Sequence, residues 1–129
     1  MIITAHAHAR AGLVGNPSDG YFGKTISFII RNFRATVRLW ESPHFEIQPT
    51  HGDLAQFASV GEFLRDQKLH GYYGGMRLIK AAIKKFHDYC HQHNVELSDH
   101  SFTVSYETDI PRLVGLAGSS AIVVAMLRR

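Results

Sequence analysis

The stretch Pro111-Arg-Leu-Val-Gly-Leu-Ala-Gly-Ser-Ser-Ala121 lies between a strand pattern and an apolar run that continues to Leu127. Pro111 has no amide hydrogen to donate, so it ends the preceding strand. Gly115 and Gly118 permit backbone conformations that a side chain would forbid, and they allow a ligand to come close to the main chain. The stretch therefore predicts a tight turn that leads from a strand into a helix.

The two serines after the glycines predict the start of that helix. Ser119 and Ser120 are of a residue type favoured at helix N-caps. The amides of a first helical turn and the positive end of the helix dipole together favour a phosphate. No Gly-Lys-Ser or Gly-Lys-Thr follows, so this is not a Walker A loop; amides and serine hydroxyls would hold the phosphates, and the hydroxyls could reach a magnesium ion. A plain, well-capped strand-to-helix connection accounts for the residues equally well.

The strand pattern before this stretch alternates strictly. From Ser101 to Tyr106, the apolar residues are expected to face the core and Ser101, Thr103 and Ser105 to face outward. Asp109 closes the strand, and its carboxylate would repel phosphates bound nearby. We therefore interpret Asp109 as a structural residue rather than as an acid or base.

Two helices are predicted before that strand. The capping-box pattern Ser59-Val-Gly-Glu62 precedes a helix that Gly71 ends. Gly74 and Gly75 lead into a longer amphipathic helix that runs to about Asn94. The apolar stripe of this second helix comprises Met76, Ile79, Ile83, Phe86 and Cys90. Its lysines lie mostly off the stripe and are more typical of a solvated face than of an RNA site.

Histidines occur in two patterns that a metal ion could use. His87 and His91 lie one helical turn apart with His93 nearby, and His6 and His8 point the same way along one predicted strand. The first pattern lacks the glutamate of a zinc-protease motif, and the second lacks a third ligand nearby. We favour a surface histidine cluster and ordinary strand histidines over metal sites.

The amino-terminal part of the chain predicts strands rich in β-branched and aromatic residues. They span residues 2–10, 25–30, 34–40 and 45–48, with turns at Arg31-Asn32 and Ser42-Pro43. In the strand over residues 34–40, Thr36 and Arg38 oppose apolar residues, so one face of the sheet is expected to be solvated.

The segment from Arg10 to Lys24 is rich in glycine and contains the turn signals Asn16-Pro17 and Asp19-Gly20. It could be a wide hairpin turn in which Asp19 bonds its own backbone. It could also be a substrate loop. Asp19 would then accept hydrogen bonds from sugar hydroxyls, while Arg10 and Lys24 would supply positive charge.

The composition is that of a soluble globular protein. The 129 residues suffice for one domain with a real core, and 45% are hydrophobic and 19% charged. The net charge of +3 suits an anionic substrate and gives little support to a nucleic-acid partner. The single cysteine, Cys90, excludes an internal disulfide and favours a reducing, cytoplasmic setting. No run approaches transmembrane length and no signal-peptide pattern is present, so no membrane partner is expected.

Both glycine-rich segments resemble the motifs of the GHMP kinases, the family of galactokinase, homoserine kinase and mevalonate kinase. The family's first motif is an arginine followed by Leu-Ile-Gly and Glu-His-Thr-Asp; here Arg10 is followed by Leu13-Val-Gly15 and Asn16-Pro-Ser-Asp19. Its second motif, Pro-x-x-x-Gly-Leu-Gly-Ser-Ser-Ala, is matched from Pro111 to Ala121, with Ala117-Gly118 in place of the single glycine. The chain resembles the plant-type glucuronokinases in particular, which share features from Gly15-Asn-Pro-Ser-Asp19 through Tyr21-Phe-Gly23, Thr25-Ile-Ser27 and Gly71-Tyr-Tyr-Gly-Gly75 to Gly118-Ser-Ser-Ala-Ile122.

The resemblance implies an α+β fold of the ribosomal-protein-S5-domain-2 type, with a mostly antiparallel sheet and helices packed on it. Residues 1–129 would be the amino-terminal, ATP-binding domain of a kinase that transfers the γ-phosphoryl group to the anomeric hydroxyl of a glucuronate-like sugar acid. The implied cofactors are ATP and Mg²⁺, with Ser119 as the metal ligand. The implied phosphate-binding residues are Gly115, Leu116, Ala117, Gly118, Ser119 and Ser120, and the implied substrate-binding residues are Arg10, Asp19 and Lys24.

Two features depart from the family pattern. Asn16-Pro-Ser18 replaces Glu-His-Thr, so galactose specificity is not carried over. The family's catalytic aspartate and its third glycine-rich motif lie farther along than Arg129. The resemblance therefore implies a truncated chain without the carboxy-terminal domain, inactive as a kinase by itself and prone to self-association.

Two functions from other classes stay open. The S5-like layout could serve as an RNA- or protein-binding module without catalysis, with the lysines of the helix over residues 75–94 as the contact face. A metal hydrolase using His87, His91 and His93 is the other. Stabilisation by nucleotides would favour the kinase, RNA binding with a steep salt dependence would favour the module, and metal analysis would decide on the hydrolase.

Overall fold

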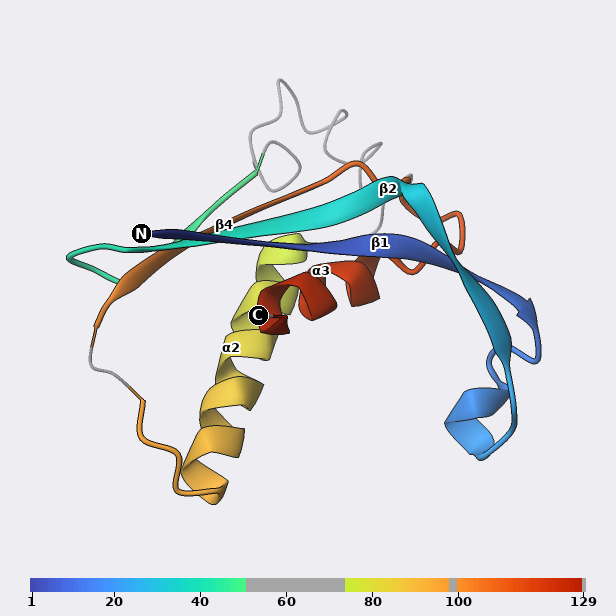
Figure 1. The fold of residues 1–129 in the computed structure, drawn as a ribbon, viewed down its shortest axis with the longest axis horizontal. Helices are drawn as coiled ribbons and strands as arrows, with labels where there is room; N and C mark the ends of the chain where they lie inside the picture. The colour runs from blue at the N-terminus through green and yellow to red at the C-terminus, as the bar shows by residue number, and fades with distance from the viewer. Residues whose placement is uncertain (51–73, 98–99, 129) are drawn as a thin grey trace, which may run out of the picture.

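The computed structural model of the chain describes residues 1–50, 74–97 and 100–128. These residues form an α+β fold in which a four-stranded sheet packs against two helices, as the sequence predicted. The elements in chain order are β1 (Ile2–Val14), the 3-10 helix η1 (Ser18–Tyr21), β2 (Ile26–Glu41), β3 (Glu46–Gln48), α2 (Gly75–Gln92), β4 (Phe102–Thr108) and α3 (Gly118–Leu127). Figure 1 shows both helices on the same side of the sheet.

The strands lie in the order β1-β2-β4-β3 across the sheet. Antiparallel pairing joins β1 to β2 and β2 to β4, whereas β3 runs parallel to β4. In this register Ala5 lies opposite Val37, and Val37 lies opposite Tyr106. Because side chains alternate along each strand, these three residues share one face of the sheet, the face that the helices cover.

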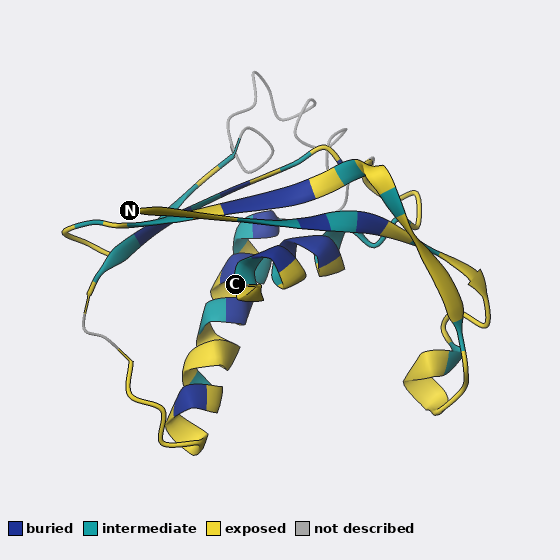
Figure 2. Ribbon diagram, viewed as in Figure 1, coloured by how far each residue is buried: buried dark blue, intermediate teal, exposed yellow. Residues whose placement is uncertain are grey.

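The core lies between that face and the two helices. Ala9 of β1, Val104 of β4, Ile79 of α2 and Ile122 of α3 are each at most 1% exposed. Figure 2 shows the buried residues gathered where the strands and helices meet. Alanines on both β1 and α3 keep the side chains at their interface small, so α3 packs closely on the sheet.

The apolar stripe predicted for α2 is exposed at Phe86, between the buried residues Ile79 and Cys90. Ile79 and Cys90 are buried as expected, whereas Phe86 is 48% exposed. Figure 1 shows that the carboxy-terminal part of α2 extends beyond α3 and away from the sheet. Spacing in the sequence identifies the stripe correctly, but it does not reveal how far the neighbouring elements reach along it.

A single strand, β2, replaces the two strands predicted over residues 25–30 and 34–40, so the turn predicted at Arg31-Asn32 is wrong. His8 pairs with Arg34 and Ala9 pairs with Ile30, which leaves residues 31–33 without a register partner in β1. These three residues form a bulge. A bulge lets the strand bend without reversing its direction, so polar residues there do not have to form a turn.

The segment predicted as a loop from Arg10 onward is partly strand. β1 continues to Val14 and pairs with β2 as far as Ile26, so the open connection covers only residues 15–25 and contains η1. The hydroxyl of Ser18 bonds the carbonyl of Gly15, which closes a tight turn at its start. Residues 15–25 thus connect β1 and β2 as a hairpin, and this connection is shorter than the segment predicted from Arg10 to Lys24.

The face of the sheet away from the helices is less solvated than predicted. Thr36 is 5% exposed and Thr103 is 3% exposed, although both were expected to face water. Their hydroxyls are bonded: Thr36 Oγ1 lies 3.0 Å from His6 Nδ1, and Thr103 donates to Ser42 Oγ at 2.8 Å. A threonine can be buried where its hydroxyl finds a partner, and alternation alone does not detect this.

The capping box at Ser59-Val-Gly-Glu62 and the helix that Gly71 was expected to end lie outside the described residues. Among the helices that are described, none is both long enough and apolar enough to cross a membrane.

Candidate functional site

The loop between β4 and α3 is fixed at its base by bonds to the bulged strand β2. The amide of Arg34 donates to the Asp109 carboxylate at 2.6 Å, and the amide of Asp109 donates to the carbonyl of Arg34 at 3.3 Å. Next to it, the amide of Ile110 bonds Thr108 Oγ1 at 3.2 Å, and the Ile110 side chain is buried. The interpretation of Asp109 as a structural residue is confirmed by these contacts.

The middle of the loop winds through an unusual backbone path. Leu113, Gly115 and Ala117 have φ angles of 61°, 76° and 55°, all in the left-handed region. Glycine adopts this region readily, whereas a residue with a Cβ does so at a cost of about 1–2 kcal/mol. Left-handed residues other than glycine are common at ligand-binding sites, where the surrounding structure holds them in place. This path brings the chain back to the start of α3.

The helix α3 begins one residue before the predicted serines. Ala117 occupies the N-cap position, and the amide of Ala121 donates to its carbonyl at 2.9 Å. The prediction that Ser119 or Ser120 would cap the helix is therefore wrong: both lie within its first turn. Ala117 adopts the left-handed region, and no side-chain cap hydrogen bond is made at this helix start.

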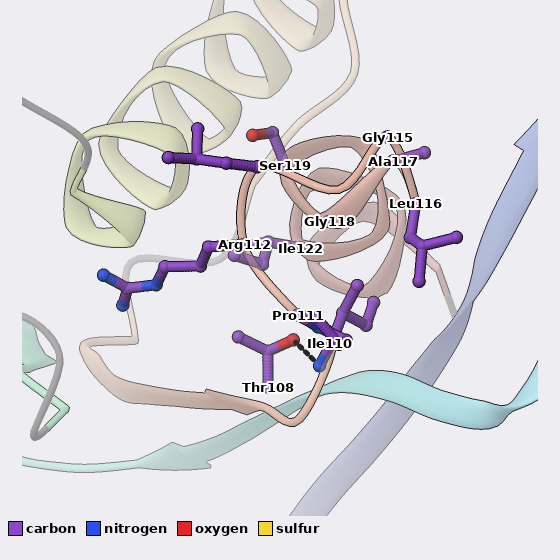
Figure 3. A pocket seen from close by; sticks show the side chains of 11 residues that line it. Thr108, Ile110, Pro111, Arg112, Gly115, Leu116, Ala117, Gly118, Ser119 and Ile122 are labelled. Atoms are coloured by element: carbon purple, nitrogen blue, oxygen red, sulfur yellow. Dashed lines mark hydrogen bonds between the residues drawn. The ribbon is translucent and has the colours of Figure 1, made fainter. Parts of the chain in front are cut away.

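A cavity of about 260 Å³ opens between this loop and the first turns of α3. Figure 3 shows the side chains around it, which come from the end of β4, the loop and the start of the helix. Its lining comprises Thr108, Ile110, Pro111, Arg112, Leu113, Gly115, Leu116, Ala117, Gly118, Ser119 and Ile122. Five of the six phosphate-binding residues expected from the sequence thus line one cavity, and Ser120 follows them in the helix.

The two glycines of the loop leave its main chain accessible. A Cβ added at Gly115 would meet no atom within 4 Å, and one added at Gly118 would lie 3.5 Å from Ile110 Cγ2. Amides in the first turn of a helix have no acceptor within the helix. A group with several negatively charged oxygens can therefore approach the backbone here without displacing a side chain.

Arg112 is a lining residue that the sequence analysis did not select. It follows Pro111 within the opening stretch and brings a positive charge to the cavity. The sequence does contain a sign of this residue, because Arg112 is the sole basic residue between Thr108 and Ile122. Glycines and serines are the residues that recur in phosphate loops, and an arginine beside them is not part of that pattern.

The structure brings one of the three expected sugar-binding residues to this loop. The amide of Arg10 in β1 donates to the carbonyl of Leu116 at 3.1 Å, so the two glycine-rich segments are in direct contact. Asp19 lies in η1 and Lys24 in the connection between β1 and β2; both are exposed, and neither is among the described residues that line the cavity.

The histidines of α2 and of its C-cap position lie on the exposed surface. His87, His91 and His93 are exposed, and the His93 ring packs against Tyr89 with 4.2 Å between the ring centroids. Within residues 1–50, 74–97 and 100–128, no three His, Cys, Asp or Glu side chains are arranged so that they could hold a metal ion.

Two curated proteins are similar to the chain along most of its length. It is 48% identical over 126 residues to Glucuronokinase 1 of Arabidopsis thaliana, which covers 97% of this chain and 35% of that protein. It is 51% identical over 120 residues to Probable glucuronokinase 2, also of Arabidopsis thaliana, which covers 92% of this chain and 33% of that protein. The chain therefore spans about a third of the length of these relatives.

A solved structure and a family match point the same way. The crystal structure of Methanococcus jannaschii mevalonate kinase superposes with a TM-score of 0.62 at 20% identity, covering 98% of this chain and 38% of that chain, so the two share a fold. Residues 77–128, which include α2, β4, the cavity loop and α3, match the GHMP kinases N terminal domain. The sequence comparisons and the shared fold agree: residues 77–128 match the GHMP kinases N terminal domain, and both curated relatives are named as glucuronokinases.

Proposed function

We propose that this chain is part of an ATP-dependent kinase that transfers the γ-phosphoryl group of ATP to the anomeric hydroxyl of a glucuronate-like sugar acid. The observation that carries the proposal is the cavity at the start of α3, where a glycine-rich loop and a first helical turn meet. The substrate class comes from the two glucuronokinase relatives. Such a reaction depends mainly on positioning the two substrates and neutralising charge.

The triphosphate would lie against the main chain from Gly115 to Ser120. Leu116 and Ala117 would contribute backbone groups, and Gly118 would allow the closest approach. The hydroxyl of Ser119, which lines the cavity, would ligate magnesium. When bound, Mg-ATP supplies the phosphoryl group to be transferred, and the chain's own residues hold and orient it.

The sugar would bind at the neighbouring hairpin. Asp19 would accept hydrogen bonds from sugar hydroxyls, and Arg10 or Lys24 would attract the sugar carboxylate. The bond between the Arg10 amide and the Leu116 carbonyl supports the part proposed for Arg10, because it joins β1 to the phosphate loop at that residue. The hydroxyl that attacks would then approach from the side of β1.

The remaining parts of the proposal concern the whole protein. Residues 1–129 would form the amino-terminal, ATP-binding domain, and a carboxylate outside them would accept the proton of the sugar hydroxyl. The supporting fact is that the chain spans only 35% of Glucuronokinase 1. The single cysteine, Cys90, is a buried free thiol, which suits a cytoplasmic protein.

The test is to titrate Mg-ATP into the chain and into its Ser119→Ala variant, with and without magnesium. We expect the variant to bind Mg-ATP more weakly, to bind ATP in EDTA about as well as the unsubstituted chain, and to unfold at the same temperature. The kinase reaction itself is assayed as sugar 1-phosphate formed from glucuronate by a protein that carries this sequence at the length of its relatives. Equal Mg-ATP binding by both proteins would remove Ser119 from the metal site, and RNA binding without nucleotide binding would favour an interaction module.

A further inference from the structure

The cavity beside α3 needs positive charge if it is to hold a triphosphate. In a Walker A loop a lysine supplies that charge, but this chain has no lysine between Thr108 and Ile122. That stretch contains one basic residue, Arg112, and one acidic residue, Asp109. Main-chain amides and a helix dipole carry only partial charges, and a magnesium ion at Ser119 would neutralise only part of a triphosphate, so negative charge would be left for a side-chain cation.

The structure separates these two charged residues. Arg112 lines the cavity, whereas the Asp109 carboxylate bonds the amide of Arg34 at 2.6 Å and is committed to holding the base of the loop. Figure 3 shows the Arg112 side chain extending to the left of the loop, the Ser119 hydroxyl above the start of α3, and Leu116 on the right. Arg112 therefore belongs to the same cavity lining as Gly115, Gly118 and Ser119.

We infer that Arg112 is the cation that binds and positions the triphosphate, in place of the lysine of a Walker A loop. The inference rests on the proposed function and adds a residue to it. A guanidinium is always charged, and its planar set of donors fits two oxygens of a phosphate at once. Arg112 thereby offers the directed contact that the partial charges of the amides lack.

The sugar carboxylate is the other anion that an arginine here could bind. The structure favours the phosphate, because Arg112 shares its cavity with Gly115, Gly118 and Ser119. The described lining does not include Asp19 or Lys24, the residues of the hairpin expected to face the sugar. Arg10, in β1, remains the nearer candidate for the carboxylate, because its amide bonds the loop at Leu116.

The experiment separates the two anions by using each alone. Inorganic tripolyphosphate and glucuronate are titrated calorimetrically into the chain, into Arg112→Gln and Arg112→Lys, and into Lys85→Gln, which removes an exposed positive charge from α2. We expect Arg112→Gln to weaken tripolyphosphate binding about tenfold, Arg112→Lys to weaken it less, and Lys85→Gln to leave it unchanged. The difference should shrink as salt is added, because an exposed cavity is screened.

Each contrary result has its own meaning. Equal tripolyphosphate binding by the chain and by Arg112→Gln overturns the inference and leaves the proposed function in place. Lost glucuronate binding with unchanged tripolyphosphate binding also overturns it, because Arg112 would then bind the sugar. No tripolyphosphate binding by the unsubstituted chain overturns the phosphate site itself, and with it the proposed function. If Arg112→Gln fails to fold, the Arg112→Lys variant provides the test. Unchanged tripolyphosphate affinity with an unchanged salt dependence in that variant would show that the guanidinium makes no directed contact with the phosphates.

Discussion

Asp109 and Arg34 are joined by two hydrogen bonds that run in opposite directions: the Arg34 amide donates to the Asp109 carboxylate at 2.6 Å, and the Asp109 amide donates to the Arg34 carbonyl at 3.3 Å. Arg34 is also the residue at which β2 resumes its pairing with β1 after the bulge. The base of the cavity loop is thus fixed to the most irregular point of the sheet. A change at either residue should reach the cavity.

We expect Asp109→Ala to lower the free energy of unfolding by about 1 kcal/mol, because the Arg34 amide loses a charged acceptor that is partly screened by water. Urea unfolding measures this loss. Glu96→Ala, which removes an exposed carboxylate outside any helix or strand, should change the unfolding free energy by less than about 0.5 kcal/mol. Equal effects from both substitutions would mean that the contact at Arg34 contributes nothing.

Gly75→Ala should be more damaging. A Cβ at Gly75 would overlap the hydroxyl of Tyr106 and lie 2.5 Å from its Cε2 and Cζ, and Tyr106 is only 5% exposed. Overpacking of this kind costs about 1–3 kcal/mol, because either the ring or the start of α2 has to move. Thermal unfolding should show a clear decrease in Tm. Gly20→Ala, at a position with no atom within 4 Å, is the control and should leave Tm nearly unchanged.

Gly118→Ala should separate folding from phosphate binding. Gly118 is the first residue of α3, and an added Cβ would make only an ordinary contact with Ile110 at 3.5 Å. Alanine also has the higher helix propensity, so the variant should be as stable as the unsubstituted chain or slightly more stable. Tripolyphosphate binding should nevertheless weaken, since the methyl group occupies the side from which the phosphates approach. A variant that binds as well as before would place the phosphates elsewhere.

Asp19→Asn should affect the sugar and not the nucleotide. Asp19 is exposed in η1 and makes no part of the described cavity lining, so its loss should leave Mg-ATP affinity nearly intact. Removing a charged hydrogen-bond partner from a binding site costs about 1.5–3 kcal/mol, which corresponds to about a ten- to hundredfold higher KM for glucuronate. Steady-state kinetics of the longer protein measure both constants. The reverse pattern would show that the two segments exchange roles.

The pH dependence of α2 follows from one ion pair on its surface. Lys84 donates to the Asp88 carboxylate at 2.6 Å, and this bond lowers the pKa of Asp88 below its ordinary value. A lowered pKa means that the ionised form favours the folded state; its contribution is complete above about pH 4 and is lost as the pH falls further. In Lys84→Gln, carboxyl NMR titration should show the pKa of Asp88 returning toward its ordinary value. Lys80→Gln, on the same helix, should leave most of the lowering in place.

The sequence predicted those elements that one regular pattern specifies. The alternation before Pro111 identified β4, and the helical spacing from Gly75 identified α2. In β1, the alternation put His6 and His8 on one face and the alanines between them on the other. In each case a single period persists over enough residues to specify the side that is buried.

The sequence predictions were wrong where the same residue types are compatible with two different local structures. Polar Arg31 and Asn32 suit a turn or a bulge, and only the pairing with β1 decides between them. Serine suits an N-cap or a first helical turn, and at α3 the left-handed Ala117 decides. Thr103 suits a solvated face or a buried hydroxyl with a partner, and Ser42, which is distant in the sequence, decides. In all three, the deciding contact or conformation cannot be read from neighbouring residues.

The hydrogen bond from the Arg10 amide to the Leu116 carbonyl has a thermodynamic consequence. It ties two segments 106 positions apart, so ordering one of them restricts the other. Where two ligands bind such linked segments, each changes the affinity of the other by the same factor, whichever binds first. A sugar at the hairpin and a nucleotide at the loop would accordingly share one coupling free energy, and the bond that links the two segments would belong to the main chain rather than to the side chains of either motif.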